Sequence, residues 1–161
     1  MLDIIHLLEQ KKNYENYINK IINTNIKFKD QPILAVNVIY KNLGEYSLLG
    51  YINTIIHYCL LVEALPLYSN YVENLRESRQ VNIEKKLLDE ITFYNKKLFQ
   101  WSLNFLEAAF SFLELTEAEC LFKEKKIKEF YHYWQNYIIN KKGYSKHKYT
   151  PTIQVVWNLQ S

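Results

Sequence analysis

The two arginines of this chain, Arg76 and Arg79, are the side chains whose type and position point most directly to a binding chemistry. They are the only arginines among 20 basic residues, and both follow Pro66 within one short amphipathic segment. Projected at about 100° per residue, Arg79 falls within the apolar stripe of that segment and Arg76 at its edge. The stripe is formed by Tyr68, Tyr71, Val72 and Leu75.

Arg79 has two interpretations. As a cation at a helix end, it would be solvated and interact with the last backbone carbonyls. As an inward-facing group, it would need an anion, because an unpaired buried charge costs several kcal/mol. A guanidinium binds carboxylates bidentately and stays charged, so the anion would be the carboxylate of a ligand whose apolar body fills an internal slot.

Other residue types that carry chemistry form no recognisable site. The four histidines are scattered, and Cys59 and Cys120 lie far apart without a C-x-x-C partner, which favours neither a zinc site nor a disulfide. The three glycines cannot supply a phosphate-binding loop or a dinucleotide fingerprint. We therefore expect no enzymatic activity, no metal and no resident cofactor.

The elements that must position these residues are predicted to be helices. The chain has 161 residues, of which 48% are hydrophobic and 23% charged, and its 3 Gly and 3 Pro are too few for a turn-rich β fold. Hydrophobic spacing and helix-end residues predict helices over 4–23, 30–42, 45–65, 67–79, 83–115 and 116–142, the last opening on a Thr116-x-x-Glu119 capping box. The expected fold is all-α, with a helical domain over 1–143 and an extended basic and aromatic tail over 144–161 packed on it.

Charge and hydropathy limit the partners. The net charge of +3 is too small to predict a polyanion by itself, and a nucleic-acid contact through the basic tail is disfavoured because the rest of the chain carries mixed charge. The apolar segments 48–62 and 98–115 are short or interrupted by polar residues, so no membrane span is expected. With an acid at position 3 and unpaired cysteines, the chain is expected to be cytoplasmic.

The helix order resembles the globin fold: two N-terminal helices, a long apolar helix, a short helix after proline and a long antiparallel pair. A haem globin needs an axial histidine on the short helix, and residues 67–80 contain none, so no haem is expected. Length, tail and the arginine on the short helix are similar to the non-haem globin sensor domains of sporulation histidine kinases and their free-standing, plasmid-borne relatives, the sporulation inhibitory proteins.

This resemblance implies a dimer that binds a fatty acid in a hydrophobic tunnel. It also implies that the carboxylate engages an arginine and a chloride ion, and that the protein titrates the signal away from the kinase and so inhibits sporulation. The only residue carried over is the arginine, Arg79 or Arg76. Candidate tunnel walls, each with ordinary core as its alternative, are Ile52, Ile55, Cys59, Tyr68, Val72, Leu75, Trp101, Phe105 and Phe112.

A second apolar row on the 83–115 helix independently suggests a dimer. Ordinary surface helices carry one apolar stripe, so an additional row is expected to pack against another surface. The row comprises Phe99, Leu103, Leu106 and Phe110. A symmetric partner is one candidate for that surface, and the tail or another helix of the same chain is the other. The alternative function is a small helical adaptor or immunity-type protein that binds another protein and has no internal ligand.

Overall fold

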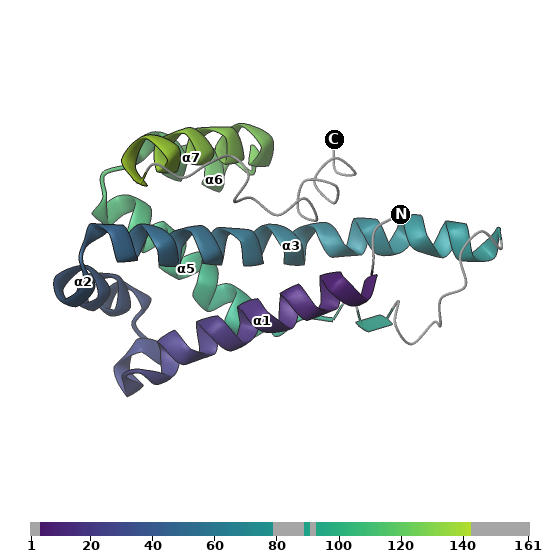
Figure 1. Ribbon diagram of the computed structural model, residues 1–161, viewed down its shortest axis with the longest axis horizontal. Coiled ribbons are helices and arrows are strands. Elements are labelled where there is room, and N and C mark those ends of the chain that lie inside the picture. The colour runs from purple at the N-terminus through teal and green to yellow at the C-terminus, as the bar shows by residue number, and fades with distance from the viewer. Residues whose placement is uncertain (1–3, 79–88, 91–92, 143–161) are drawn as a thin grey trace.

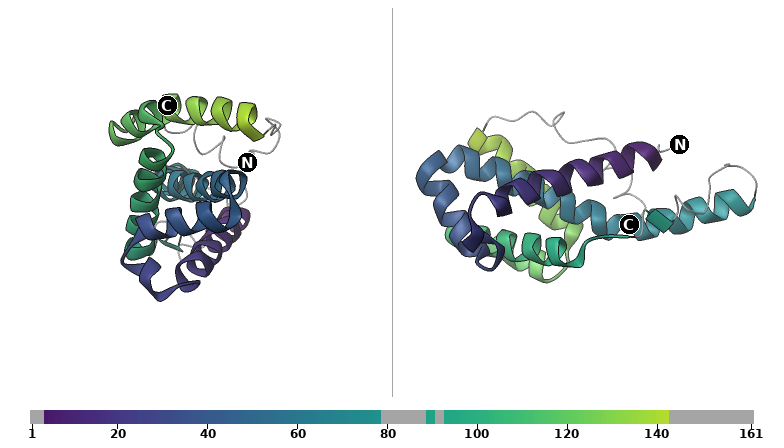
Figure 2. Two further views of the ribbon diagram at one scale, coloured as in Figure 1. Left: turned by 90° about the vertical axis from the view of Figure 1, so that its left-hand side faces the viewer. Right: turned by 90° about the horizontal axis from the view of Figure 1, so that it is seen from below.

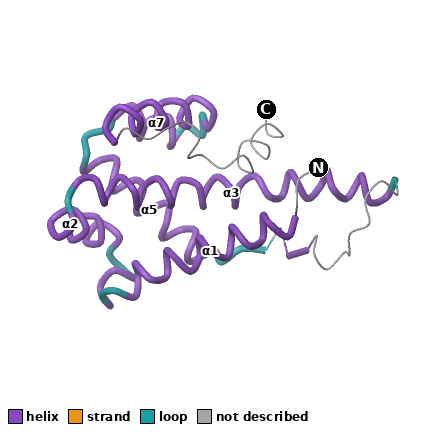
Figure 3. The backbone as a smooth tube through the Cα atoms, in the orientation of Figure 1, coloured by secondary structure: helices purple, strands orange, loops and turns teal. Residues whose placement is uncertain are grey.

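Apolar residues at helical spacing organise the whole chain, and the computed structural model is all-α over the residues that it describes, 4–78, 89–90 and 93–142. This confirms the expected fold class. Among those residues there is no strand (Figure 3). Six α-helices and one 3-10 helix have defined bounds: α1 Ile4–Asn23, η1 Ile26–Lys29, α2 Pro32–Leu43, α3 Glu45–Glu77, α5 Lys96–Phe112, α6 Thr116–Lys123 and α7 Ile127–Lys142.

The first two helices end where the sequence indicates. The helix predicted over 4–23 is confirmed, and α2 begins at Pro32, whose ring is tolerated in a first helical turn. Gly44 ends α2 with φ of 91°, a backbone conformation that L side chains rarely adopt, and its N–H donates to the Tyr40 carbonyl at 2.9 Å. The glycine therefore allows α3 to begin one residue later in a new direction.

The break predicted at Pro66 is wrong, because α3 continues through it as one helix of 33 residues. Proline lacks the N–H for one helical hydrogen bond, and its ring crowds the preceding turn. Pro66 and Leu67 are exposed, so the ring faces solvent at the point where the helix leaves the packed core. The third and fourth expected helices are thus a single element.

The helices predicted over 83–115 and 116–142 are each interrupted. Helix α5 begins at Lys96, after a non-helical stretch in which the Asn95 side chain accepts the Leu98 N–H at 3.1 Å. The expected capping box at Thr116 is also wrong, since Leu115 occupies the N-cap and no side chain caps α6. Left-handed residues separate these helices, namely Glu114 with φ of 58° and Lys125 with φ of 60°.

Helix α3 is the central element (Figures 1 and 2). Helices α1, α2 and α5 pack against it, while α6 packs on α5 and α7. In Figure 1, α1 lies below α3 and α7 above it, and the C-terminal part of α3 extends past both, which the right-hand view of Figure 2 also shows.

The N-terminal two-thirds of α3 are apolar on almost every side. The segment Glu45–Leu67 has 23 residues and a mean hydropathy of 1.5, which is long and apolar enough to cross a membrane by length and composition. Of its most apolar 18-residue window, 72% is buried inside the protein. A core helix covered by neighbours has the same composition.

Candidate functional site

The residues predicted to bind a carboxylate lie at the far end of α3 and beyond it. Arg79 lies outside the described residues, and Arg76 lies in α3 with its side chain outside the description. The side chains of three predicted tunnel residues, Tyr68, Val72 and Leu75, are likewise outside it. These five positions therefore remain predictions.

The helical register nevertheless relates Arg76 to the buried face of α3. Positions 58 and 76 are separated by about five turns of 3.6 residues, so both lie on one line along the helix. Leu65 and Ser69 lie close to the same line, and Tyr58, Leu65 and Ser69 are all buried. Position 76 thus lies on the same line along the helix as these buried positions.

The remaining predicted tunnel walls form a filled core, with one exception. Ile52, Ile55 and Phe105 have no exposed surface, while Cys59 and Trp101 are also buried; all five belong to one continuous hydrophobic cluster. The Trp101 and Phe105 rings stack with centroids 5.3 Å apart.

Phe112 is the exception. It is 38% exposed, so the prediction that it lines an interior tunnel is wrong. At the C-terminal end of α5, its ring instead meets the Tyr40 ring edge-on, with centroids 4.9 Å apart.

The second apolar row on α5 is covered by the same chain over half its length. Leu106 and Phe110 are fully buried, so their assignment to a dimer interface is wrong. The cause is the break at Glu114, which lets α6 and α7 fold back over α5. There the Phe110 ring packs against the rings of Phe122, Phe130 and Trp134. Phe99 and Leu103 are half-buried.

A polar cluster inside the core joins α3 to α7. His57 is buried, and its Nδ1 donates to the Asn53 carbonyl at 2.7 Å. The Asn53 side-chain oxygen accepts the Trp134 indole N–H at 3.0 Å, and the His57 ring meets the Tyr131 ring at 5.9 Å. Burial lowers the pKa of His57, which keeps the imidazole neutral. These contacts describe a structural link between helices rather than a reactive site.

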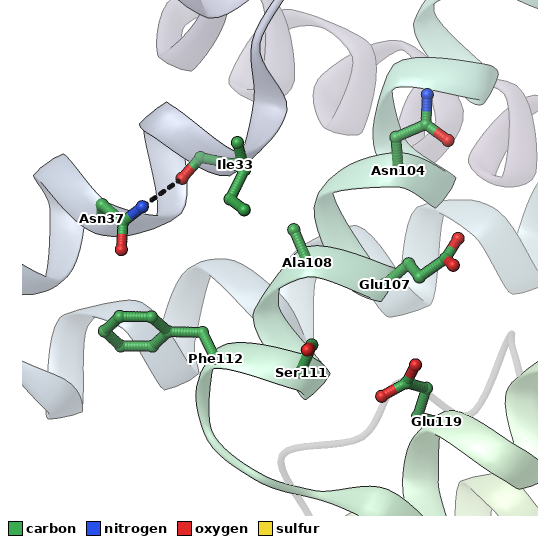
Figure 4. A pocket seen from close by; sticks show the side chains of 8 residues that line it. All are labelled: Ile33, Asn37, Asn104, Glu107, Ala108, Ser111, Phe112 and Glu119. Carbon is green, nitrogen blue, oxygen red and sulfur yellow. Dashed lines mark hydrogen bonds between the residues drawn. The ribbon is translucent and has the colours of Figure 1, made fainter.

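A surface pocket of about 370 Å³ lies between α2, α5 and α6 (Figure 4). Its two carboxylates, Glu107 and Glu119, are both paired with Lys123, at 3.2 and 2.9 Å. Asn37 donates its side-chain amide to the Ile33 carbonyl at 3.1 Å. Lys123 therefore balances part of the negative charge of this pocket, whose lining also includes the exposed Phe112 ring.

A larger pocket of about 830 Å³ lies between α1 and the segment that leads into α5, and sequence reasoning missed it. One of its walls is Lys11, a lysine only 5% exposed. The signal was present in the sequence, since Lys11 lies four residues after Leu7 and seven before Ile18. Both neighbours are fully buried, so the lysine lies on the apolar stripe of α1.

The electrostatics of this pocket are unusual. Burial lowers the pKa of Lys11, and Glu15 offsets that effect only in part. Burial also raises the pKa of Glu15. The nearby Tyr58 hydroxyl is buried without a hydrogen-bond partner among the described residues, and burial together with Glu15 raises its pKa.

The two cysteines differ in exposure: Cys120 is exposed, and its hydrogen bond to Glu124 raises the pKa of its thiol. Cys59 is buried and burial raises the pKa of its thiol, which keeps it unreactive. Over the part of the chain that the structure describes, no three His, Cys, Asp or Glu side chains gather as metal ligands would. Comparison of the chain with protein-family models, with curated proteins and with solved structures found no match.

Proposed function

We propose that this protein is a non-enzymatic, sensor-type binding protein that captures a fatty acid, with the acid's carboxylate bound by an arginine at the end of α3 and a chloride ion as a further candidate ligand there. In a cell that sporulates, such a protein would titrate the signal away from a sensor histidine kinase and inhibit sporulation, acting in the cytoplasm. The observation that carries the proposal is the register of α3, which aligns Arg76 with the buried positions Tyr58, Leu65 and Ser69.

The filled core determines where an acyl chain would lie. Side chains occupy the space around Ile52, Ile55 and Phe105, so in this proposal the acyl chain runs along α3 beyond Leu65, toward residue 76. Burying each methylene contributes about 0.8 kcal/mol, and a long chain gains on the order of 10 kcal/mol before the cost of association. The apolar stripe predicted for Tyr68, Val72 and Leu75 would supply the contact surface.

Native mass spectrometry of the purified protein, with lipid extraction, tests this proposal. A co-purifying fatty acid is expected in the wild-type protein and in Lys41→Gln, which changes an exposed cation at the end of α2, next to the opposite end of α3. It should be lost in Arg76→Gln or in Arg79→Gln, and the variant that loses it identifies the binding residue. A wild-type protein that carries no acid, and that acquires none when incubated with palmitate, would rule the proposal out.

A helical adaptor that binds another protein is the second candidate function, and a specific surface favours it. Four large hydrophobic side chains on and beside α2 are at least 41% exposed. They are Ile33, Tyr40, Leu43 and Tyr46. An apo mass in the experiment above would leave this candidate as the better explanation.

A homodimer remains part of the leading proposal. Leu103 is half-buried on α5, and Phe99 contributes its ring partly to its own chain, through edge contacts with Tyr58 and Tyr94. Of the four residues first assigned to the interface, Leu103 is therefore the one best placed to meet a partner.

A further inference from the structure

Lys11 is a buried lysine with no ion pair among the described residues, although the Glu15 carboxylate one helical turn away acts on it at longer range. Its side chain is 5% exposed, and among the described residues its ammonium nitrogen forms no hydrogen bond or ion pair. Its contact is with the Phe93 ring, whose centroid lies 5.9 Å from Nζ. An aromatic face attracts a cation but replaces neither the water nor the counter-ion that an ammonium loses on burial.

The pocket that Lys11 lines combines positive charge with apolar surface. Lys12, Lys96 and Lys97 are exposed at its rim, against two carboxylates, Glu15 and Glu90. The pocket has a volume of about 830 Å³, enough for a small organic molecule. Its apolar walls are Leu8, Phe93, Tyr94 and Leu98. Phe93 is 72% exposed, so its ring has free surface that the apolar part of a ligand could contact.

We propose that this pocket binds an organic monocarboxylate with an apolar body, its carboxylate paired with the Lys11 ammonium and its body lying against Phe93 and Leu98. One carboxylate matches the one buried cation of the wall, Lys11, because the other lysines of the lining are exposed at the rim, where solvent screens their charge. The site lies between α1 and the start of α5 and does not depend on the function proposed above.

Decanoate is a suitable probe because it joins one carboxylate to a flexible apolar chain, and decanol provides the same chain without the charge. Isothermal titration of the full-length protein should show decanoate binding that is at least about tenfold tighter than decanol binding, the effect of one charge-assisted hydrogen bond. Lys11→Met keeps the apolar stem and should remove most of this difference. Lys20→Met, at an exposed lysine of α1 outside the pocket lining, should change the affinity less than about threefold.

Each outcome of these titrations either supports or overturns the proposed carboxylate site. Decanoate affinity that is equal in the wild type and Lys11→Met, or equal affinity for decanoate and decanol, overturns the proposal. If Lys11→Met does not fold, Phe93→Ala, a change at an exposed ring, must weaken decanoate binding for the proposal to stand. Loss of decanoate binding in the Arg76 or Arg79 variants with full retention in Lys11→Met would support the arginine site alone, so the two sites can fail separately.

Discussion

At the scale of single residues, the sign of a buried polar group's contribution depends on whether it has a partner. The Trp101 indole N–H donates to the Phe28 carbonyl at 2.7 Å, across 73 residues of sequence and inside the core. The Tyr58 hydroxyl is equally buried but has no hydrogen-bond partner among the described residues. A satisfied buried group stabilises the fold modestly, whereas an unsatisfied one carries its desolvation cost.

Removing these two groups should therefore have opposite consequences. We expect Trp101→Phe to lower the free energy of unfolding by about 1–3 kcal/mol, because it deletes the donor and leaves the Phe28 carbonyl buried and unpaired. Tyr58→Phe removes only the hydroxyl and should leave stability unchanged or raise it. Urea unfolding followed by circular dichroism measures both. A clear destabilisation by Tyr58→Phe would mean that its hydroxyl has a partner.

His57 should make the stability depend on pH in a defined direction. Burial lowers its pKa in the folded state below the ordinary value of 6.5, so the unfolded chain binds the proton more readily. The stability is then fully present above about pH 6.5 and declines as the pH falls below it, by up to about 1.4 kcal/mol per pH unit. His57→Gln, although less stable overall, should show a shallower decline between pH 7.5 and 5.5 in urea titrations. Parallel profiles would contradict this assignment.

At the scale of the helices, the turns after α5 and α6 end in residues that are unusual for their position. Both helices end with a bond from the residue after the left-handed position to a carbonyl five residues back, Leu115 N–H to Phe110 at 2.9 Å and Lys126 N–H to Leu121 at 3.0 Å. This is the Schellman arrangement, which usually places glycine at the left-handed position. Here Glu114 and Lys125 occupy it.

A glycine at residue 125 should stabilise the protein. We expect Lys125→Gly to raise the free energy of unfolding by about 1 kcal/mol, because an L side chain with φ of 60° is strained and glycine is not. The change also removes the exposed ion pair with Glu63 at 3.5 Å, which contributes little. Glu124→Gly, next to it at φ of −79°, is the matched control and should destabilise. If both glycines destabilise, the strain argument is wrong.

These helix ends also explain what the sequence could and could not predict. Helix α1 and the Gly44 stop were predictable, because spacing and glycine agreed with the tertiary structure. The boundary between α5 and α6 was also predicted, at residues 115 and 116. The break at Lys125 was not, since no glycine marks it, and Pro66 misled in the opposite sense because an exposed proline can be accommodated within a long helix.

The candidate sites also divide into features that the sequence could predict and features that it could not. The core faces of Ile55 and Phe105 followed from periodicity alone. The Lys11 pocket depended on α1 meeting the segment before α5, a long-range contact that local patterns do not encode. A lysine within the apolar stripe of α1 was the one local signal for it.

At the scale of the whole molecule, α6 and α7 cover part of the apolar surface of α5. Because the chain turns at Glu114, its last two helices cover Phe110 and join α3 through the Trp134 to Asn53 hydrogen bond. Apolar surface that a single long helix would have offered to a partner is used within the chain. A symmetric partner that packs on α5 would therefore contact its uncovered part, near Leu103.

The homodimer proposal can be tested at that position. We expect the wild-type protein to elute as a dimer in size-exclusion chromatography with light scattering, and Leu103→Glu to elute as a folded monomer. In the monomer, a carboxylate at this half-buried position would stay partly hydrated. In a symmetric apolar interface it would lose its hydration, and the carboxylates of the two protomers would repel each other. Ile33→Glu, on the exposed face of α2, is the control and should leave the dimer intact. A dimer disrupted by Ile33→Glu but not by Leu103→Glu would place the interface on α2. A monomeric wild-type protein would contradict the homodimer proposal, and Leu103 would then be a residue at the edge of the monomer's own core.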